Sequence, residues 1–331
     1  MGADAEFQIP IIEFRTGSSD LTRGTEGWHH LCKRVRDACE TYGCFRVVYE
    51  RISREIREET FRLLKELVEE VPLERKQKNV NPKPYHSYFG PCSQQSLYEG
   101  FGIEDASNFD SVKRFAQLMW SHGHPYFCET VNTMVKQMEE LNNIIWAMII
   151  DSYGLGEKYE PVMINHKTML RMMKYMAPSS EEYRRGLHAH TDKLASTIIC
   201  DDQTPGLEIE GKDGRWIKLS SSPTSFVFVV GDPLMVWSNG RMKAAKHRVM
   251  MTGDKDRYSI ATFTVPVDGT VIKTPPEFVD EQRPPLFKDF DFTDFLFFSF
   301  SEQAKLIDSA DQIYAFASLS SPQIPAQNHA L

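Results

Sequence analysis

Apolar side chains recur at helical spacing through most of the first half of the chain. The pattern predicts helices over residues 26–41 and 53–71, separated by Gly43 and the strand-like segment CFRVVY. Residues 79–101 are rich in Pro, Gly, Ser and Tyr, which predicts a long loop. We therefore expect this half to consist of helices around a small amount of strand.

The longest predicted helix begins at Pro125, a residue suited to a first helical turn, and ends at Gly154. One face of this segment carries an apolar stripe with several methionines: Val131, Met134, Val135, Met138, Leu141, Ile145, Met148 and Ile149. Such a stripe is typical of a helix that packs on a sheet. We expect this helix to be the main scaffold element.

From Thr168 onward the pattern changes to short apolar or alternating runs separated by Gly, Pro, Asp and Asn. Eight runs are candidate strands: LRMMKYM, ASTIICDD, GLEIE, RWIKL, SFVFVVGD, LMVWS, HRVMM and RYSIATFTV. The segment GKDGRW, with Gly211, Asp213 and Gly214, indicates a hairpin turn. Strands at this spacing favour a β-sandwich or jelly roll, flanked by the helices.

After Pro276 the segment PPEFVDEQRPPLF is typical of a linker, and the aromatic segment that follows predicts a final helix. Five phenylalanines lie between Phe292 and Phe300. They either seal the sheet, which is the more common arrangement, or cap an apolar substrate pocket.

Composition narrows the class of protein. The 331 residues are 41% hydrophobic and carry a net charge of −8, which indicates a folded chain and argues against a nucleic-acid surface. The six cysteines form no CxxC pair, so reduced and mostly buried thiols are expected. The start MGADAEFQIP lacks the features of a secretory signal, and no apolar run is long enough to cross a membrane. We expect a soluble cytoplasmic protein.

The run HAHTD places His190 two residues before Asp192, and His247 follows in KHRVMM. Residues two apart on a strand project to the same face, so the pair can point at one metal ion. Two imidazoles and one carboxylate are the minimal set that binds Fe(II) while leaving positions open for substrate and oxygen. The three residues are therefore the predicted metal ligands and catalytic centre.

A second pair of residues, in the segment RYSIATF, predicts which kind of small molecule would bind beside such a metal. Arg257 can bind a carboxylate with its guanidinium fork, and Ser259, on the same strand face, can add a hydroxyl. Tyr175 could reach the same carboxylate. Because iron would chelate the other end of a dicarboxylic acid, 2-oxoglutarate is the acid that fits.

With these residues in order, the chain resembles the plant-type 2-oxoglutarate- and Fe(II)-dependent dioxygenases almost from end to end. The matching segments are IPIIEF, YGCFRVV, GLHAHTD, TPGLEIEGKDGRWIKL, VVGDPLMVWSNGR, KHRV and RYSIATF. Within this family, the alkenyl/hydroxyalkyl-producing (AOP-like) branch is most similar to the segments LRMMKYMAP, AHTDK, HRVMMTGDKDRYS and EFVDEQRPPLFK.

The resemblance implies an α+β fold with a double-stranded β-helix (jelly-roll) core. It implies Fe(II) on His190, Asp192 and His247, with 2-oxoglutarate bound by Arg257, Ser259 and Tyr175. It further implies that O2 oxidises a small plant metabolite or hormone by hydroxylation, desaturation or dealkylation, with release of succinate and CO2 and with ascorbate in support. No nucleic acid, membrane or obligate protein partner is implied.

Two positions depart from the usual pattern of this family. Met173 stands two residues before Tyr175, where most members carry an asparagine, and Val229 stands where an asparagine commonly precedes the GD turn. Both changes remove polar groups near the core. Neither touches the predicted metal ligands or Arg257 and Ser259.

The expected organisation divides the chain into four parts. Residues 1–120 form an amino-terminal region, 121–160 the scaffold helix, 161–270 the β-helix core, and 271–331 a carboxyl-terminal helical segment. Candidate substrate contacts come from three of these parts: Tyr85 and Phe89 in the long loop, Lys193 and Phe263 in the core, and Phe298 and Phe300 near the end. For Lys193, a solvated surface position is the simpler expectation.

Three other functions remain open. A zinc hydrolase also uses His and carboxylate ligands, but it leaves Arg257 and Ser259 unexplained and no HExxH is present. An oxidase of the same fold would not consume 2-oxoglutarate. A catalytically silent member of the fold would bind small molecules without turnover.

Overall fold

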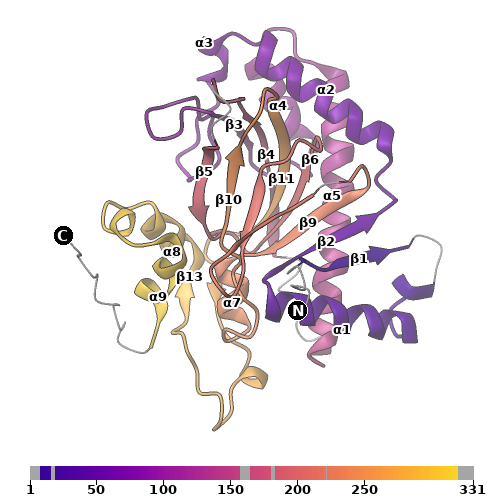
Figure 1. The fold of residues 1–331 in the computed structure, drawn as a ribbon, viewed down its shortest axis with the longest axis vertical. Coiled ribbons are helices and arrows are strands. Elements are labelled where there is room, and N and C mark those ends of the chain that lie inside the picture. The colour runs from indigo at the N-terminus through magenta and orange to yellow at the C-terminus, as the bar shows by residue number, and fades with distance from the viewer. Residues whose placement is uncertain (1–7, 16–18, 157–164, 180–182, 221, 320–331) are drawn as a thin grey trace, which may run out of the picture.

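The computed structural model describes residues 8–15, 19–156, 165–179, 183–220 and 222–319. Residues 1–7, on which most of the expectation about a signal sequence rests, lie outside these ranges. Two sheets pack face to face and a layer of helices covers the larger one (Figure 1). The expected jelly-roll core with flanking helices and one long scaffold helix is confirmed.

The larger sheet has seven strands in the spatial order β1, β2, β9, β6, β11, β4, β3. Their bounds, in that order, are Ile11–Phe14, Cys44–Tyr49, Ser225–Val230, Ser196–Asp201, Arg257–Pro266, His166–Tyr175 and Tyr98–Ile103. The β1 and β2 strands pair in parallel, and the other pairs of this sheet are antiparallel. The amino-terminal region therefore contributes strands to the core sheet.

The smaller sheet has four strands in the order β5, β10, β7, β8. These are Arg184–His190, His247–Met251, Leu207–Glu210 and Trp216–Lys218. The predicted hairpin turn joins β7 to β8, with Gly214 at a φ of +76°. A two-stranded ribbon, β12 (Val271–Ile272) with β13 (Phe290–Asp291), completes the strands.

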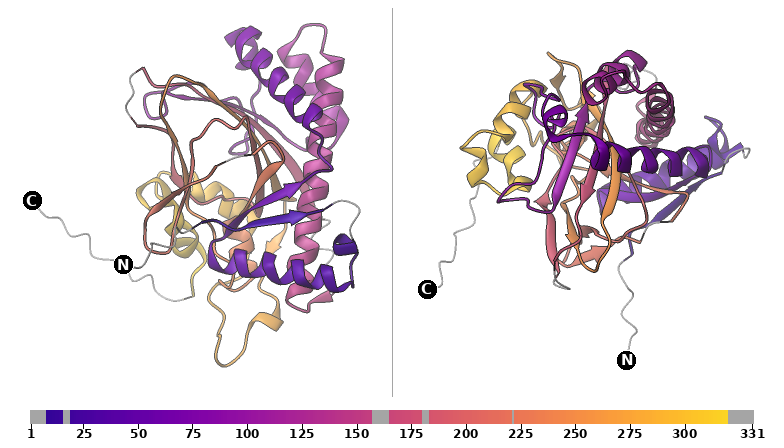
Figure 2. Two further views of the ribbon diagram at one scale, coloured as in Figure 1. Left: turned by 45° about the vertical axis from the view of Figure 1, so that its right-hand side comes forward. Right: turned by 90° about the horizontal axis from the view of Figure 1, so that it is seen from above.

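The helices lie mainly against the outer face of the larger sheet. They are α1 (Glu26–Thr41), α2 (Arg54–Glu70), α3 (Leu73–Lys76), α4 (Phe109–Met119), α5 (Pro125–Ser152), α7 (Asp232–Trp237), α8 (Phe292–Ser299) and α9 (Gln312–Ala317). Figure 2 shows α5 running the length of this layer, as its apolar stripe predicts. The last two helices, yellow in Figure 1, lie on the side of the sandwich away from α1 and α5.

Side-chain alternation explains how the larger sheet serves two cores. On β4, Leu170 and Met172 point to the helices, whereas Met173 and Tyr175 point into the space between the sheets. On β11, Ile260 likewise packs on the helical side. The inner face is therefore free to present functional side chains.

The predicted helix boundaries are confirmed for the first two helices and for α5, because their ends carry local stop and start signals. Thr25 caps α1 by accepting a hydrogen bond from the backbone of Trp28, and Gly43 follows this helix at a φ of +71°. Ser53 caps α2 in the same way. Pro125 occupies the first turn of α5.

The predictions of local structure were wrong or incomplete at four places. The first four residues of the run LMVWS belong to helix α7, and Ser238 caps its end, so the run is not a strand. All six residues of this helix are buried, and Pro233 sits in its first turn. Strand β5 was absent from the eight predicted runs, and helix α4 was not predicted. The predicted loop 79–101 gives way to β3 at Tyr98.

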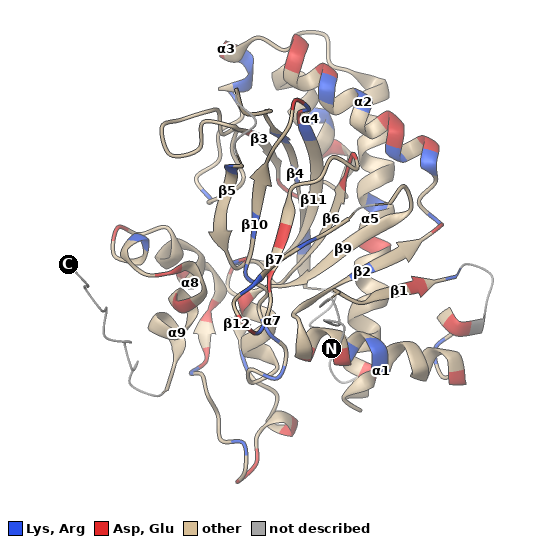
Figure 3. Ribbon diagram, viewed as in Figure 1, with Lys and Arg blue, Asp and Glu red and all other residues tan. Residues whose placement is uncertain are grey.

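Charged residues are mixed in sign on the surface. Figure 3 shows basic and acidic residues alternating along α2, where ion pairs join Arg54 to Glu58 and Arg62 to Glu66. Within the described residues, each helix is too short or too polar to cross a membrane.

Candidate active site

Three potential metal ligands meet at one end of the smaller sheet. His190 is the last residue of β5 and His247 the first of β10, and the two are direct partners in the strand register. Nε2 of His190 lies 3.6 Å from Oδ1 of Asp192, and Nε2 of His247 lies 3.7 Å from the same oxygen. Asp192 lies two residues beyond the end of β5, in the irregular segment that leads to β6, so strand alternation does not orient its carboxylate.

Backbone contacts fix the orientation of both imidazoles. Nδ1 of His190 lies 2.8 Å from the carbonyl of His188, and Nδ1 of His247 lies 2.9 Å from the carbonyl of Ala245. A proton on each Nδ1 satisfies these carbonyls and leaves the Nε2 lone pairs facing Asp192. Burial, followed by the charge of the neighbouring imidazole, lowers the pKa of His190 well below its ordinary value, which favours the neutral ligand form.

A hydrogen bond to its other oxygen orients the carboxylate of Asp192. The Thr197 hydroxyl donates a hydrogen bond of 2.5 Å to Oδ2 of Asp192, which leaves Oδ1 directed at the histidines. Two imidazole nitrogens and one carboxylate oxygen, all within 4.8 Å of one another, match the donor set that suits Fe(II) with open positions. The residues present therefore fit an iron ion.

The predicted co-substrate residues lie on the inner face of the larger sheet. Arg257 of β11 pairs in register with Tyr175 of β4, and its guanidinium carbon lies 5.4 Å from the centre of the tyrosine ring. Arg257 and Ser259 are each only 1% exposed. Nε of Arg257 is buried and finds no hydrogen-bond partner among the described residues, as expected of a donor that awaits an acceptor.

Two contacts of this group were not foreseen from the sequence. Nη2 of Arg257 donates to Oδ2 of Asp201 at 2.8 Å, so a buried carboxylate already orients the guanidinium. Gly206 packs beside it, where an added Cβ would lie 2.9 Å from Cδ of Arg257. Burial raises the pKa of Tyr175, which keeps its phenol protonated as a hydrogen-bond donor.

The two departures from the family pattern have clear structural settings. The Tyr175 hydroxyl lies 3.6 Å from the sulfur of Met173, so a thioether stands near the phenol where an asparagine is usual. Val229 is fully buried in the apolar cluster between the sheets, beside Val227 and Cys44. Both positions thus add apolar packing to the inner face.

The candidate substrate contacts fall into three groups. Tyr85 and Phe300 touch edge to face, with ring centroids 4.6 Å apart, and Phe89 packs on Tyr98 at 5.8 Å. Phe263 is half-buried where the inner core meets the carboxyl-terminal cluster. Phe298 packs on Phe316 at 5.0 Å.

Lys193 is not a solvated lysine. It is 3% exposed and its ammonium contacts Asp232 at 2.8 Å, together with Thr191 and the carbonyl of Ser309. The acidic group that it contacts belongs to the protein. Its burial depends on the carboxyl-terminal segment, which local sequence does not reveal.

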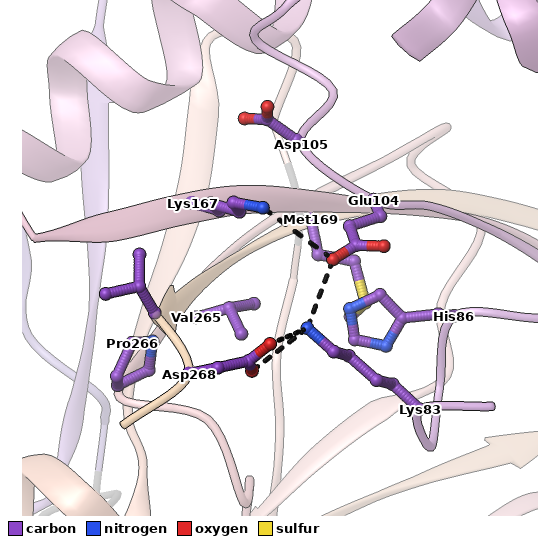
Figure 4. Close-up of a pocket in the computed structure, with 10 residues that line it drawn as sticks. Lys83, His86, Glu104, Asp105, Lys167, Met169, Val265, Pro266 and Asp268 are labelled. Atoms are coloured by element: carbon purple, nitrogen blue, oxygen red, sulfur yellow. Dashed lines mark hydrogen bonds and ion pairs between the residues drawn. The ribbon is translucent and has the colours of Figure 1, made fainter. Parts of the chain in front are cut away.

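A separate cavity of about 270 Å³ lies beside the long loop and is lined by charged residues (Figure 4). Lys83 contacts Asp268 at 2.8 Å and Glu104 at 3.3 Å, so its charges are internally matched. His86 also lines this cavity. The network anchors the loop that carries Tyr85 to the end of β11.

Comparisons with known proteins agree with this geometry. Residues 9–123 match the model of the "non-haem dioxygenase in morphine synthesis N-terminal" family, and residues 160–266 match the "2OG-Fe(II) oxygenase superfamily". The chain is 37% identical to "Probable 2-oxoglutarate-dependent dioxygenase AOP1.2" of Arabidopsis thaliana, over 94% of this chain and 96% of that protein.

Two solved structures have the same architecture. The rice dioxygenase for auxin oxidation superposes with a TM-score of 0.79 and 26% identity, over 94% of this chain and all of that one. The Arabidopsis thaliana counterpart, in its binary complex with 2-oxoglutarate, gives 0.74 and 27% identity, over 84% of this chain and all of that one.

Proposed function

Because this chain belongs to the 2-oxoglutarate-dependent dioxygenases, we propose that His190, Asp192 and His247 hold its iron, while Arg257, Ser259 and Tyr175 bind the far carboxylate of 2-oxoglutarate. With Fe(II) and 2-oxoglutarate bound, such a site uses O2 to oxidise a C–H bond of a small plant metabolite, with release of succinate and CO2. The choice among hydroxylation, desaturation and dealkylation depends on the substrate.

One observation carries this proposal. A metal-ligand set and a buried arginine with an unpaired Nε line the same space between two sheets. A dicarboxylic acid can bridge them, because one end chelates the metal and the other accepts the guanidinium hydrogen bonds. A zinc hydrolase has no use for the second part of this arrangement.

The protein residues have separable tasks. The two backbone carbonyls and Thr197 orient the metal ligands, so the donor atoms are aligned before the metal binds. Asp201 holds the guanidinium of Arg257 in place. The apolar side chains around them limit the access of water to the reacting groups.

Succinate formation coupled to loss of an organic substrate tests the proposal. The purified protein, supplied with Fe(II), 2-oxoglutarate and O2, is incubated with fractions of a plant extract, and we expect at least one fraction to stimulate succinate release. We expect His190→Ala to abolish it. Thr262→Val is the matched control, because it removes a buried hydroxyl that has no partner.

Two results would contradict the proposal. Substrate oxidation without succinate would identify an oxidase that does not consume 2-oxoglutarate. Binding of both iron and 2-oxoglutarate with no turnover of any fraction would identify a silent binding protein. The intact ligand set and the buried Arg257 favour the active enzyme.

A further inference from the structure

Arg171 is a buried cation on the inner face of β4. It is 6% exposed and lies on the same strand face as Met173 and Tyr175, which point between the sheets. The proposed function assigns no role to this side chain.

The strand register places Arg171 beside the reaction site. It pairs with Ala261 on β11, midway between Ser259 and Phe263 on the inner face. Phe263 is in turn level with Thr197, the residue that hydrogen-bonds to the carboxylate ligand. Arg171 thus lies about 7 Å along the strand from the level of Thr197 and about 7 Å from the level of Ser259.

Glycines on the neighbouring edge strand make room for the guanidinium. On β3, a Cβ at Gly100 would lie 2.8 Å from Nη2 of Arg171, and a Cβ at Gly102 would lie 2.5 Å from the carbonyl oxygen of Tyr85. The loop can therefore approach the inner face closely. Tyr85 adopts a φ of +69°, a left-handed conformation that directs its carbonyl to Arg171.

The hydrogen-bond partners of Arg171 are neutral. Nη2 donates to the Tyr98 hydroxyl at 2.7 Å, and Nη1 donates to the Tyr85 carbonyl. Among the residues that the structure describes, no carboxylate forms an ion pair with it. Burying a guanidinium without a counter-ion is costly, which suggests that an anion completes this site.

The other buried charges of the pocket are matched within the protein. Arg257 pairs with Asp201, and Lys193 pairs with Asp232. Asp192 faces the two histidines as a metal ligand. Arg257 is already assigned to 2-oxoglutarate. Among the described residues, Arg171 is therefore the buried cation of this pocket that has neither a carboxylate partner nor a proposed ligand.

Tyr85 links this cation to the metal end of the pocket. Burial raises the pKa of Tyr85, the charge of Asp192 raises it further, and the charge of Arg171 opposes the rise. Its phenol is thus within electrostatic reach of both groups. Its ring contacts Phe300, which supplies apolar surface on the far side.

We propose that Arg171 binds a carboxylate of the organic substrate, so that the enzyme acts on a small organic acid whose apolar body packs against Tyr85 and Phe300. This inference rests on the proposed function, because it places the substrate beside the metal. The bound acid supplies the missing counter-ion, and its fixed end determines which C–H bond faces the iron.

The experiment compares the wild-type enzyme with Arg171→Gln, Arg171→Lys and the control Lys174→Gln. Lys174 is on the same strand but pairs with Asp256 on the outer side. Plant extract is separated on an anion exchanger at neutral pH into retained acids and unretained neutral compounds. Part of the acid fraction is coupled to ammonia with a carbodiimide, which converts carboxylates into neutral amides.

We expect succinate release to be stimulated by the acid fraction and not by the neutral or amidated fractions. With the active acid isolated, kcat/KM should fall about 100-fold in Arg171→Gln. Arg171→Lys, which keeps the charge but loses the fork, should recover part of this loss, and Lys174→Gln should match the wild type.

Calorimetry provides a readout that does not depend on turnover. With Mn(II) in place of iron, Arg171→Gln should lose binding of the active acid while its affinity for 2-oxoglutarate changes by less than about threefold, well under 1 kcal/mol. Circular dichroism establishes that each variant is folded. If Arg171→Gln fails to fold, the Arg171→Lys comparison decides between a charge effect and a geometric one.

Three results would overturn the inference. The neutral or amidated fraction could stimulate succinate release as strongly as the acids. Arg171→Gln could retain full affinity for the active acid, or it could weaken 2-oxoglutarate binding by more than about tenfold, which would assign Arg171 to the co-substrate. If no fraction stimulates even the wild type, the proposed function fails first and this inference falls with it.

Discussion

Replacing Lys193 with methionine should strongly destabilise the fold, because it removes the counter-ion of a fully buried carboxylate. Lys193 is 3% exposed and Asp232 is 0% exposed, and their charged atoms are 2.8 Å apart. At an effective dielectric constant of about 20, this separation corresponds to an attraction of about 6 kcal/mol before desolvation is subtracted. Among the described residues, Oδ1 of Asp232 has no hydrogen-bond partner, and the Thr191 hydroxyl is the one neutral side chain that also supports this carboxylate.

We expect Lys193→Met to lower the free energy of unfolding by about 3–5 kcal/mol, the range for breaking one side of a buried ion pair. Burial already raises the pKa of Asp232, and the Lys193 ammonium opposes that rise. Without the lysine this pKa rises further. The cost should therefore shrink as the pH is lowered and the carboxyl group becomes protonated, and it should grow as the pH rises above the ordinary carboxyl range.

The free energy of unfolding is measured with denaturant for four proteins. These are the wild type, Lys193→Met, Asp232→Asn and the double variant. The double-mutant cycle should give a coupling energy of about 2 kcal/mol. A loss of less than about 1 kcal/mol in Lys193→Met, with no dependence on pH, would refute the reasoning. Such a result would mean that water reaches the pair and screens it.

Three further changes test other contacts. Thr197→Val should weaken Mn(II) binding about tenfold or more, measured by calorimetry, because the carboxylate ligand loses its supporting hydrogen bond, whereas Thr262→Val should have no effect. Arg257→Lys should raise the KM for 2-oxoglutarate at least about tenfold in the succinate assay, and an unchanged KM would exclude the proposed clamp. Although burial raises the pKa of Asp151, hydrogen bonds from Arg23 and Trp28 lower it below its ordinary value. Because Arg23 is partly exposed, Asp151→Asn should cost only about 1 kcal/mol of stability at neutral pH. In unfolding curves this difference should disappear as the pH falls below about 4, because protonation of Asp151 removes the charge that these contacts stabilise.

The sequence was sufficient for elements whose ends carry local signals. Caps and glycines define α1 and α2, and the proline start and apolar stripe define α5. The prediction of a strand over LMVWS was wrong because a short segment that is buried on every side has no periodicity to separate helix from strand. Its Pro233, following a Gly–Asp pair, is the signal that indicates a helix start.

Candidate site residues were predictable where chemistry is concentrated in short motifs. His190, Asp192 and Arg257 belong to such motifs, whereas Asp201 becomes a partner of Arg257 only through the pairing of β6 with β11. The sequence alone could have indicated the position of Arg171, because alternation along β4 puts it on the same face as Tyr175. Its lack of a carboxylate partner, however, depends on contacts between distant segments, which no local pattern encodes.

The edge-to-face contact between Tyr85 and Phe300 joins two segments that lie far apart in the chain and carry none of the proposed iron ligands. The proposed apolar contacts with the substrate are therefore encoded by other stretches of the gene than the iron ligands, whereas Arg171 belongs to the core strand β4. Substitution of Tyr85 or Phe300 changes the proposed apolar surface without replacing an iron ligand, so duplicated copies of such a gene can diverge towards new metabolites while the metal-binding residues stay constant.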